Sequence, residues 1–476
     1  MRPCIAWCSR PRSSATFTEG ALEAVTKKLV LIVVDGLTPA AFERAVESGR
    51  APALAFLAER GAYRRATSVF PSLTPVCLSS IATGAGPDIH HIPHLVWWHR
   101  GERRVVEYGS SFAALRAAGM AQSITDTIYN MNQQHLGKDA VTVYESLEDA
   151  GLVTAAVNIT CYRGRTRYLP TLPWVTKPAY GPKRFFFYSL FESDPTGAPL
   201  AVRNRPGGSI DAYAAAVGRW LVTRDGFDFL AYYLSDFDYA SHVHGPDGAD
   251  GVALERTDAA IQALLDAAGG PDEFLERYAV VLHSDHGQTD VEQVAQLETS
   301  LAAFAEEIVV TASNRAGQVY LLPGARVGAA QLAERLDGEP AVEVTLRREG
   351  ADAVARREGE ELRFRPSGDA WQTGGDAAIL DHPDALHRAW SALANPNAGE
   401  LLVSAAEGWE LVDMGGRHHA GGGSHGSLVA GDSVVPLLTI GVDAAPVRIT
   451  DVAPAVLAHF GVEPPPYART LAHHAA

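Results

Sequence analysis

The 476-residue chain contains few cysteines, namely Cys4, Cys8, Cys77 and Cys161. They are too few and too irregularly spaced to form a disulfide framework, and no Cys-x-x-Cys pair suggests a structural zinc site. The sequence therefore excludes the class of small secreted domains that disulfides hold together. A reducing compartment fits this cysteine usage best, and we predict that the protein is cytoplasmic.

The sequence also lacks any long apolar run. No stretch approaches the roughly 20 apolar residues that a membrane-spanning helix needs. The N-terminal segment MRPCIAWCSRPRSSATFTEG has arginines but no continuous apolar core of the length that export requires. We therefore expect no membrane span, and we interpret residues 1–26 as a disordered leader.

Positive charge is scarce relative to negative charge. The chain has 40 Lys and Arg residues against 56 Asp and Glu residues, which gives a formal net charge of -16. This balance argues against a nucleic-acid polymer or an anionic membrane surface as the main partner. A small anionic substrate stays open, because a bound metal could make one pocket locally positive.

What the sequence does contain is the pattern of a large α/β protein. Apolar runs typical of parallel strands buried on both faces recur at residues 27–36, 153–159, 227–234, 278–287 and 434–441. Amphipathic helical stretches lie between them, so we predict a three-layer α/β/α fold with a mostly parallel sheet. The alternation of strand and helix patterns changes near residue 296. We therefore predict a core of 27–295 and 420–470 and a small α+β insertion at 296–419.

Six polar residues lie where these buried elements begin or end. In open α/β sheets, residues that are distant in sequence converge outside the carboxyl ends of the strands. A lone Asp there is more often a helix cap or turn former, so the prediction depends on the joint occurrence. Three Asp and three His suit zinc or a similar transition metal, and six ligands divide into the two groups of three that a two-metal site needs. The candidates are Asp35, Asp238, His242, Asp285, His286 and His425.

The segment SDFDYASHVHGP, residues 235–246, offers two Asp and two His residues. Residues four apart at the start of a helix share a face, which pairs Asp238 with His242. Asp236 does not have this spacing from His242. We therefore leave Asp236 and His244 outside the ligand set.

A metal pair also needs a group that acts on the substrate. The segment FPSLTPVCLSSIATG places Thr74 at the expected start of a helix, where free backbone N–H groups favour an anion. A Thr hydroxyl is a poor nucleophile unless a metal or a base lowers its pKa. Beside a metal, Thr74 is a candidate nucleophile, whereas alone it would be an ordinary helix cap.

Five segments together resemble the alkaline phosphatase superfamily, and within it the type I phosphodiesterase/nucleotide pyrophosphatase family. They are VVDG (33–36), PSLTP (71–75), DYASHVHGP (238–246), SDHG (284–287) and GSHG (423–426). The resemblance extends from about residue 27 to 465 and includes the ending ITDVAPAVLAHFGVEPP. The family pattern selects the same Asp238 and His242 pair as the helical spacing does.

The resemblance implies two divalent metal ions, zinc with manganese as the alternative. The implied ligand sets are Asp238, His242 and His425 for one ion, and Asp35, Asp285 and His286 with the Thr74 oxygen for the other. The implied mechanism is in-line attack of Thr74 on phosphorus, a covalent phospho-threonine, and its hydrolysis. The expected partner is therefore a small phosphorylated substrate, with nucleotides among the candidates.

The sequence departs from the family after the nucleophile. The family has an Asn there that helps bind a phosphoryl oxygen, but Leu95 stands at about that position. Another donor must fill this role, or the substrate differs. The candidate donors are His90, His91, His94, Arg100, Arg163, Arg165 and Arg167. Trp97 and Trp98 could stack on a base or cover an alkyl group, although paired aromatics are more often core contacts.

We therefore predict a hydrolase of phosphate diesters or pyrophosphate bonds. The apolar residues 95–98 favour a diester over a monoester dianion, which needs additional positive charge. A phosphonate hydrolase and a phosphomonoesterase are the alternatives in the same superfamily. A sulfatase is disfavoured because the Cys/Ser-x-Pro-x-Arg pattern that contains that family's nucleophile is missing around Thr74. Cys77 does not stand at the position of that nucleophile. A catalytically silent binding protein is also disfavoured, since six polar groups in one cleft are costly to keep.

Overall fold

The computed structural model describes residues 26–170, 177–187, 209–249 and 251–468. The predicted leader lies almost wholly outside the described residues and stays a prediction. Cys77 and Cys161 are buried free thiols. Within the four described ranges, no helix combines the length and the apolar character needed to cross a membrane.

A seven-stranded, mostly parallel sheet forms the centre of the molecule. β1 lies in its middle and pairs in parallel with β10 on one side and with β9 on the other. β21 runs antiparallel to both of its neighbours, so the last of the predicted strands is reversed. In spatial order the strands are β2 (Ala62–Thr67), β21 (Val434–Ile440), β10 (Tyr278–His283), β1 (Lys28–Val34), β9 (Phe229–Leu234), β5 (Thr154–Val157) and β8 (Arg184–Phe186).

The sheet is buried on both faces, as the aliphatic sequence of β1 predicts. Leu31 and Val33 lie in one apolar cluster. Ile32 and Val34 lie in a second cluster on the opposite face, because successive side chains of a strand alternate. The first cluster is covered by α3 (Thr74–Thr83), α7 (Val143–Asp149) and α16 (Val452–His459), and the second by α1 (Pro39–Ser48), α2 (Pro52–Arg60), α8 (Ile210–Thr223) and α10 (Val252–Ala267).

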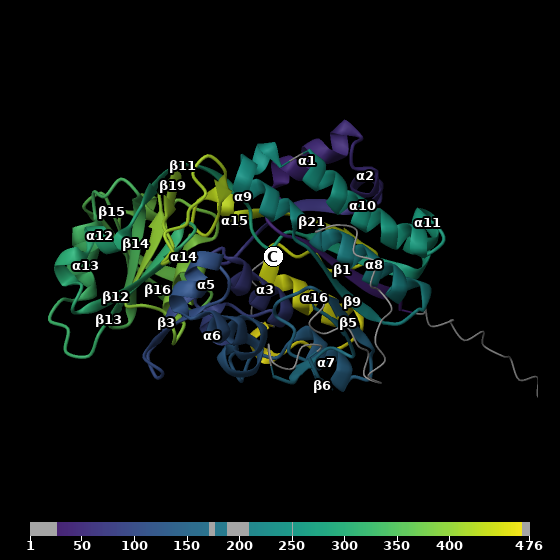
Figure 1. The fold of residues 1–476 in the computed structure, drawn as a ribbon, viewed down its shortest axis with the longest axis horizontal. Helices are drawn as coiled ribbons and strands as arrows, with labels where there is room; N and C mark the ends of the chain where they lie inside the picture. The colour runs from purple at the N-terminus through teal and green to yellow at the C-terminus, as the bar shows by residue number, and fades with distance from the viewer. Residues whose placement is uncertain (1–25, 171–176, 188–208, 250, 469–476) are drawn as a thin grey trace, which may run out of the picture.

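Figure 1 shows this arrangement, with α1, α2 and α10 on one side of the strands and α3, α7 and α16 on the other. The predicted three-layer α/β/α fold is therefore confirmed.

A second, antiparallel sheet of seven strands lies to one side of the core, in green in Figure 1. In spatial order it contains β12 (Ile308–Ser313), β13 (Ala316–Leu321), β18 (Leu401–Ala405), β14 (Val342–Glu349), β15 (Asp352–Arg357), β16 (Glu360–Ser367) and β17 (Ala370–Gly375). Helices α13 (Ala329–Leu336) and α14 (Ala385–Ala394) belong to the same part of the chain. These elements fall inside the predicted insertion, whose exact boundaries stay predictions.

A small three-stranded sheet connects the two parts. β11 (Thr289–Ala295) pairs in parallel with β19 (Gly408–Leu411) and antiparallel with β20 (Gly423–Ser424). β11 begins shortly after β10 ends, so this pairing brings the segment that follows β20 next to the carboxyl end of the central strands.

Candidate metal centre

The three central strands carry the acidic candidates to one edge of the sheet. Asp35 follows β1, Asp285 and His286 follow β10, and α9 (Asp236–Gly248) with Asp238 follows β9. Because these three strands are adjacent and parallel, their carboxyl ends meet. The loop after β20 adds His425.

One group of ligand atoms converges around His286. Its Nε2 lies 3.2 Å from Asp35 Oδ1 and 3.7 Å from Asp285 Oδ2. Both of these carboxylate oxygens are buried and have no hydrogen-bond partner among the described residues. Two buried carboxylate oxygens and an imidazole nitrogen that face one another without such partners form a set that fits a divalent cation.

The other oxygen of each carboxylate is held in place. The Tyr233 hydroxyl donates to Asp35 Oδ2. The backbone N–H groups of Gly36 and His286 donate to Asp285 Oδ1 over 3.3 and 3.0 Å. Each carboxylate is therefore oriented through one oxygen and presents the second to the common point.

A second group forms around Asp238. Its Oδ2 lies 3.4 Å from His242 Nε2, as the spacing of four residues predicts, and its Oδ1 lies 3.9 Å from His425 Nε2. The Gln288 amide donates to Asp238 Oδ1. Gly36 permits this approach, because a Cβ at that position would lie 2.8 Å from Asp238 Oδ1.

The three candidate histidines all present Nε2 to the site. In each, Nδ1 contacts a backbone carbonyl, which makes Nδ1 the donor and leaves the Nε2 lone pair for a metal. The pairs are His242 with Gly423 O at 2.8 Å, His286 with Gly287 O at 3.0 Å and His425 with Ser72 O at 2.8 Å. The rings of His286 and His425 stack with their centroids 3.6 Å apart.

The structure groups the candidate ligands slightly differently from the sequence prediction. The atoms that lie within 4.8 Å of one another belong to Asp35, Asp285 and His286, and to Asp238, His286 and His425. His286 therefore belongs to both groups. His242 contacts Asp238 of the second group. All six predicted ligands therefore converge, but they do not separate into two groups of three with no shared member.

The pKa values of these groups reflect negative charge crowded in a buried place. Burial, together with the Asp238 and Asp285 carboxylates, raises the pKa of Asp35 well above its usual value. Burial and the Asp238 charge raise the pKa of Asp285 to about 7. Burial alone would lower the pKa of His242, but the Asp238 carboxylate outweighs it and raises that pKa to about 9. A divalent cation would relieve this repulsion.

Metal affinity should therefore fall steeply as the pH is lowered. A metal needs neutral His242 and ionised Asp285, and both bind protons below the pKa values of about 9 and about 7. We expect the apparent Kd for Zn²⁺ to rise by at least about tenfold per unit between pH 8 and pH 6, since one or more protons are displaced. Calorimetric titration with a competing chelator at each pH measures this, and a constant Kd over the range would contradict the assignment.

Thr74 lies at the first position of α3 and at the edge of the ligand cluster. Its Oγ1 is 3.1 Å from His286 Nε2. Pro75 at the next position has no N–H to lose, and the start of this ten-residue helix favours negative charge. The predicted nucleophile and the predicted ligands are thus neighbours.

The ligand atoms open into a cavity of about 810 Å³. Part of its wall is apolar and includes Leu95, Leu115 and Met131. Three large apolar side chains of the lining are exposed to solvent. Among the described residues that line the cavity, Arg417 is the only arginine or lysine. The exposed side chains are Phe112 at 69%, Tyr239 at 75% and Val243 at 57%.

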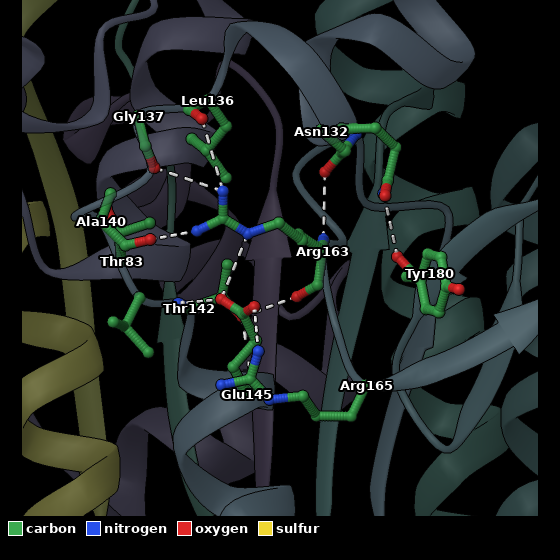
Figure 2. A network of polar contacts seen from close by, with 12 residues as sticks. Thr83, Asn132, Leu136, Gly137, Ala140, Thr142, Glu145, Arg163, Arg165 and Tyr180 are labelled. Atoms are coloured by element: carbon green, nitrogen blue, oxygen red, sulfur yellow. Dashed lines mark hydrogen bonds and ion pairs between the residues drawn. The ribbon is translucent and has the colours of Figure 1, made fainter.

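The basic run after β5 lies elsewhere. Figure 2 shows Arg163 and Arg165 on either side of Glu145, with Arg163 Nε 3.2 Å from Oε2 and Arg165 Nη1 2.7 Å from Oε1. Arg165 also pairs with Asp149 over 2.8 Å. Neither these arginines nor Arg167 line the cavity. Their prediction as phosphoryl-oxygen donors is therefore not supported.

The remaining candidate donors also have other contacts. Arg100 pairs with Glu400 over 2.8 Å, and buried His90 contacts the Ser80 hydroxyl over 3.1 Å. His91 and His94 likewise do not line the cavity. The sequence prediction did not find the group that replaces the missing Asn.

Trp97 and Trp98 make core contacts, the more common of the two alternatives for paired aromatics, and stacking on the substrate is not supported. They belong to β3 (Val96–His99), and neither lines the cavity. Trp97 is buried against the ring of His135, with centroids 5.2 Å apart, and Trp98 packs on the core. Within residues 95–98, Leu95 alone lines the cavity.

The two residues left out of the ligand set have other surroundings. Asp236 accepts hydrogen bonds from the Ser209 hydroxyl and the Ile210 N–H at the start of α8. His244 is exposed. Sequence reasoning missed Tyr233 and Gln288, which hydrogen-bond to two candidate ligands. A tyrosine inside an apolar strand and a glutamine after Asp-His-Gly carry no signal of their own.

The chain matches the type I phosphodiesterase/nucleotide pyrophosphatase family over residues 29–428. This is most of its 476 residues, so the chain belongs to that family. The predicted resemblance is confirmed, and the chain is a hydrolase of the phosphodiesterase/nucleotide pyrophosphatase type. A search of the curated proteins gave no match.

Solved structures share the fold. Phosphonoacetate hydrolase from Sinorhizobium meliloti 1021, in complex with phosphonoformate, superposes with a TM-score of 0.61 at 19% identity, covering 91% of this chain and 96% of that chain. Murine ectonucleotide pyrophosphatase/phosphodiesterase 5 gives 0.60 at 14% identity, covering 93% and 97%. An inactive threonine-to-alanine variant of the murine protein, in complex with AMP, gives 0.60 at 14% identity, covering 93% and 96%.

Proposed function

We propose that the protein is a two-metal hydrolase of phosphate diesters or pyrophosphate bonds that works through a phospho-threonine intermediate on Thr74. The observation that carries this proposal is the convergence of Asp35 Oδ1, Asp285 Oδ2 and His286 Nε2, with the Thr74 hydroxyl 3.1 Å from that nitrogen.

The residues present fit two divalent ions, zinc with manganese as the alternative. The proposed ligands are Asp35, Asp285, His286 and Thr74 for one ion, and Asp238, His242 and His425 for the other. The unpartnered buried oxygens of Asp35 and Asp285 support this assignment, because a cation satisfies both. When bound, the ions would supply Lewis-acid stabilisation of the phosphoryl oxygens and lower the pKa of the nucleophile.

Thr74 Oγ attacks phosphorus in line with the ester bond that breaks. The hydroxyl proton passes to solvent, the Oγ–P bond forms, and the leaving group departs with the electron pair of its P–O bond. Water then attacks the same phosphorus and loses a proton to solvent. The Oγ–P bond breaks with its electron pair on Oγ, which takes up a proton and becomes the Thr74 hydroxyl again. The start of α3 favours the negative phosphoryl group beside Thr74.

The murine relative supports the role given to Thr74, since its threonine-to-alanine variant is described as inactive and is in complex with AMP. The same complex supports nucleotides as one substrate class. The apolar wall and the exposed Phe112 and Tyr239 offer contacts for a nucleobase or another apolar ester group.

The lining of the cavity supports a diester over a monoester. A monoester dianion carries additional charge that such sites usually neutralise with a further cation. Arg100, Arg163 and Arg165, which could have supplied it, pair with carboxylates elsewhere. Arg417, the arginine among the described lining residues, is exposed.

Two alternatives use the same site. A phosphonate hydrolase shares the fold, as phosphonoacetate hydrolase does. A phosphomonoesterase would use the same nucleophile. A silent binding protein would have no need for a complete set of ligand atoms arranged around a nucleophile, and it would show no turnover.

A substrate panel tests the proposed preference. We expect kcat/KM for bis-p-nitrophenyl phosphate to exceed those for p-nitrophenyl phosphate and for a p-nitrophenyl phosphonate monoester. The leaving group is the same throughout, so the differences report on the part of the substrate that is retained. A monoester preference above about tenfold, or about 1.4 kcal/mol of transition-state binding, would overturn the diesterase proposal.

Phe112→Ala sharpens this panel. It should lower kcat/KM for bis-p-nitrophenyl phosphate more than for methyl p-nitrophenyl phosphate, because only the first retains an aromatic ester group. Leu169→Ala is the matched control, since Leu169 is similarly exposed at 64% but does not line the cavity. Equal losses for both substrates would exclude contact between Phe112 and the retained group.

A further inference from the structure

We propose that Asn314, at the tip of a hairpin in the second sheet, donates a hydrogen bond to a phosphoryl oxygen of the substrate. This inference rests on the proposed function. It assigns a donor to the role for which the segment after Thr74 offers only Leu95. The donor would come from a different part of the chain, far from the nucleophile in sequence.

The hairpin that carries Asn314 joins β12 to β13 through the two residues Asn314 and Arg315. Asn314 has φ +56°, a left-handed conformation that asparagine tolerates better than most residues. A tight turn would by itself explain an asparagine here, so the proposal depends on where the side chain points.

The hairpin tip is fixed next to the metal ligands. The Arg315 N–H donates to the carbonyl oxygen of His425 over 2.9 Å. The buried Arg315 guanidinium pairs with Asp432 over 3.0 Å. The Leu411 N–H donates to the Asn314 carbonyl over 2.7 Å. The tip is therefore held through its backbone and through the Arg315 side chain.

The amide of Asn314 is oriented with its NH₂ group toward the site. The Ser313 hydroxyl donates to Asn314 Oδ1 over 2.7 Å, which occupies the acceptor end. The Nδ2 atom lies 3.3 Å from His425 Nε2. Asn314 is 6% exposed and lines the cavity. A metal requires an acceptor atom, so a donor presented here suits an anionic oxygen rather than the metal itself.

Thr74 and Asn314 each contact one of two histidine rings that stack on each other. Thr74 Oγ1 is 3.1 Å from Nε2 of His286, and Asn314 Nδ2 is 3.3 Å from Nε2 of His425. The two rings are nearly parallel, with an angle of 9° between them. A phosphoryl group attacked by Thr74 is therefore within the same small region as the Asn314 amide.

The two hydrogen bonds of the His425 ring support the role of Asn314 as a donor to the substrate. His425 Nδ1 is the donor to Ser72 O, so Nε2 is the acceptor for the Asn314 amide. When Nε2 serves as a metal ligand, the amide loses this acceptor. A buried N–H without an acceptor is costly, and a phosphoryl oxygen in the cavity would replace the lost one.

Binding measurements on a non-reacting background test the inference. Asn314→Gly removes the amide while glycine keeps the positive φ, and Asn314→Asp keeps the shape but presents an acceptor. Each is combined with Thr74→Ala, loaded with metal, and titrated calorimetrically with bis-p-nitrophenyl phosphate. We expect the Kd to rise by about tenfold for the glycine variant and by more for the aspartate variant, whose charge repels the probe.

The matched control is Glu358→Gly, which likewise introduces glycine at a positive-φ position in a two-residue hairpin turn of the same sheet. Glu358 has φ +52° and is 85% exposed, with an ion-pair distance of 3.9 Å to Arg357. It should bind the probe as the parent does. Metal content and melting temperature should be unchanged in all variants.

The outcomes separate this inference from the proposed function. Unchanged probe affinity in Asn314→Gly would overturn the inference alone. Loss of metal from Asn314→Gly would also overturn it, because Asn314 would then support a ligand rather than contact the substrate. If the metal-loaded Thr74→Ala parent does not bind the probe, the proposed function fails and this inference fails with it.

Discussion

Thr74→Ala is expected to lower kcat/KM for bis-p-nitrophenyl phosphate by at least about a thousandfold, because it removes the attacking oxygen and leaves the rest of the site intact. The fold and the metal content should not change. Thr74 contributes only its hydroxyl to the cluster, through the contact with His286. Steady-state kinetics and elemental analysis of the same preparation measure both effects.

Thr74→Ser is the matched control for this substitution. It keeps an attacking hydroxyl at the start of α3 and should retain partial activity, since only a methyl group is lost. Near-normal turnover by Thr74→Ala would mean that water attacks phosphorus directly. The metal site could then stand, but the phospho-threonine mechanism could not.

Removal of either metal ion is expected to have the second large effect. Purified protein should bind close to two equivalents of Zn²⁺ or Mn²⁺, and chelation should abolish activity. Asp238→Ala or His425→Ala should remove one ion, whereas Asp35→Ala or Asp285→Ala should remove the other. Each should lower kcat/KM by at least about a hundredfold, because a missing ligand costs more than the loss of a supporting residue.

His244→Ala provides the control for these ligand variants. His244 lies on α9 two residues after His242, but it is exposed and outside the ligand set. It should keep both ions and normal turnover. A stoichiometry of zero in metal-supplemented buffer would refute the metal assignment, and loss of an ion from His244→Ala but not from His242→Ala would reverse the choice between these two histidines.

The convergence of the candidate ligands could be predicted from the sequence because they lie at the ends of recognisable strands. Asp35, Asp238 and Asp285 follow three apolar runs, and adjacent parallel strands place their carboxyl ends together whatever the lengths of the connections. The pairing of Asp238 with His242 depends only on helical spacing, which the structure shows as a 3.4 Å contact.

The parts that were not predicted depend on packing between distant segments. The sequence analysis did not single out Asn314, because its contact with His425 joins a hairpin tip to a loop far along the chain. Likewise, the sequence around Arg163 and Arg165 does not indicate which carboxylates pair with these arginines. Arg163 and Arg165 lie around Glu145, in a helix that precedes them in the chain.

The most direct test of the central claim is rapid-quench mass spectrometry of metal-loaded protein with bis-p-nitrophenyl phosphate. Attack by Thr74 transfers the p-nitrophenyl phosphoryl group to its Oγ and releases one p-nitrophenol. We predict that this group is found on the peptide containing Thr74 during the first turnover and is absent from Thr74→Ala. Release of p-nitrophenol in the first turnover with Thr74 unmodified at every quench time would contradict the account.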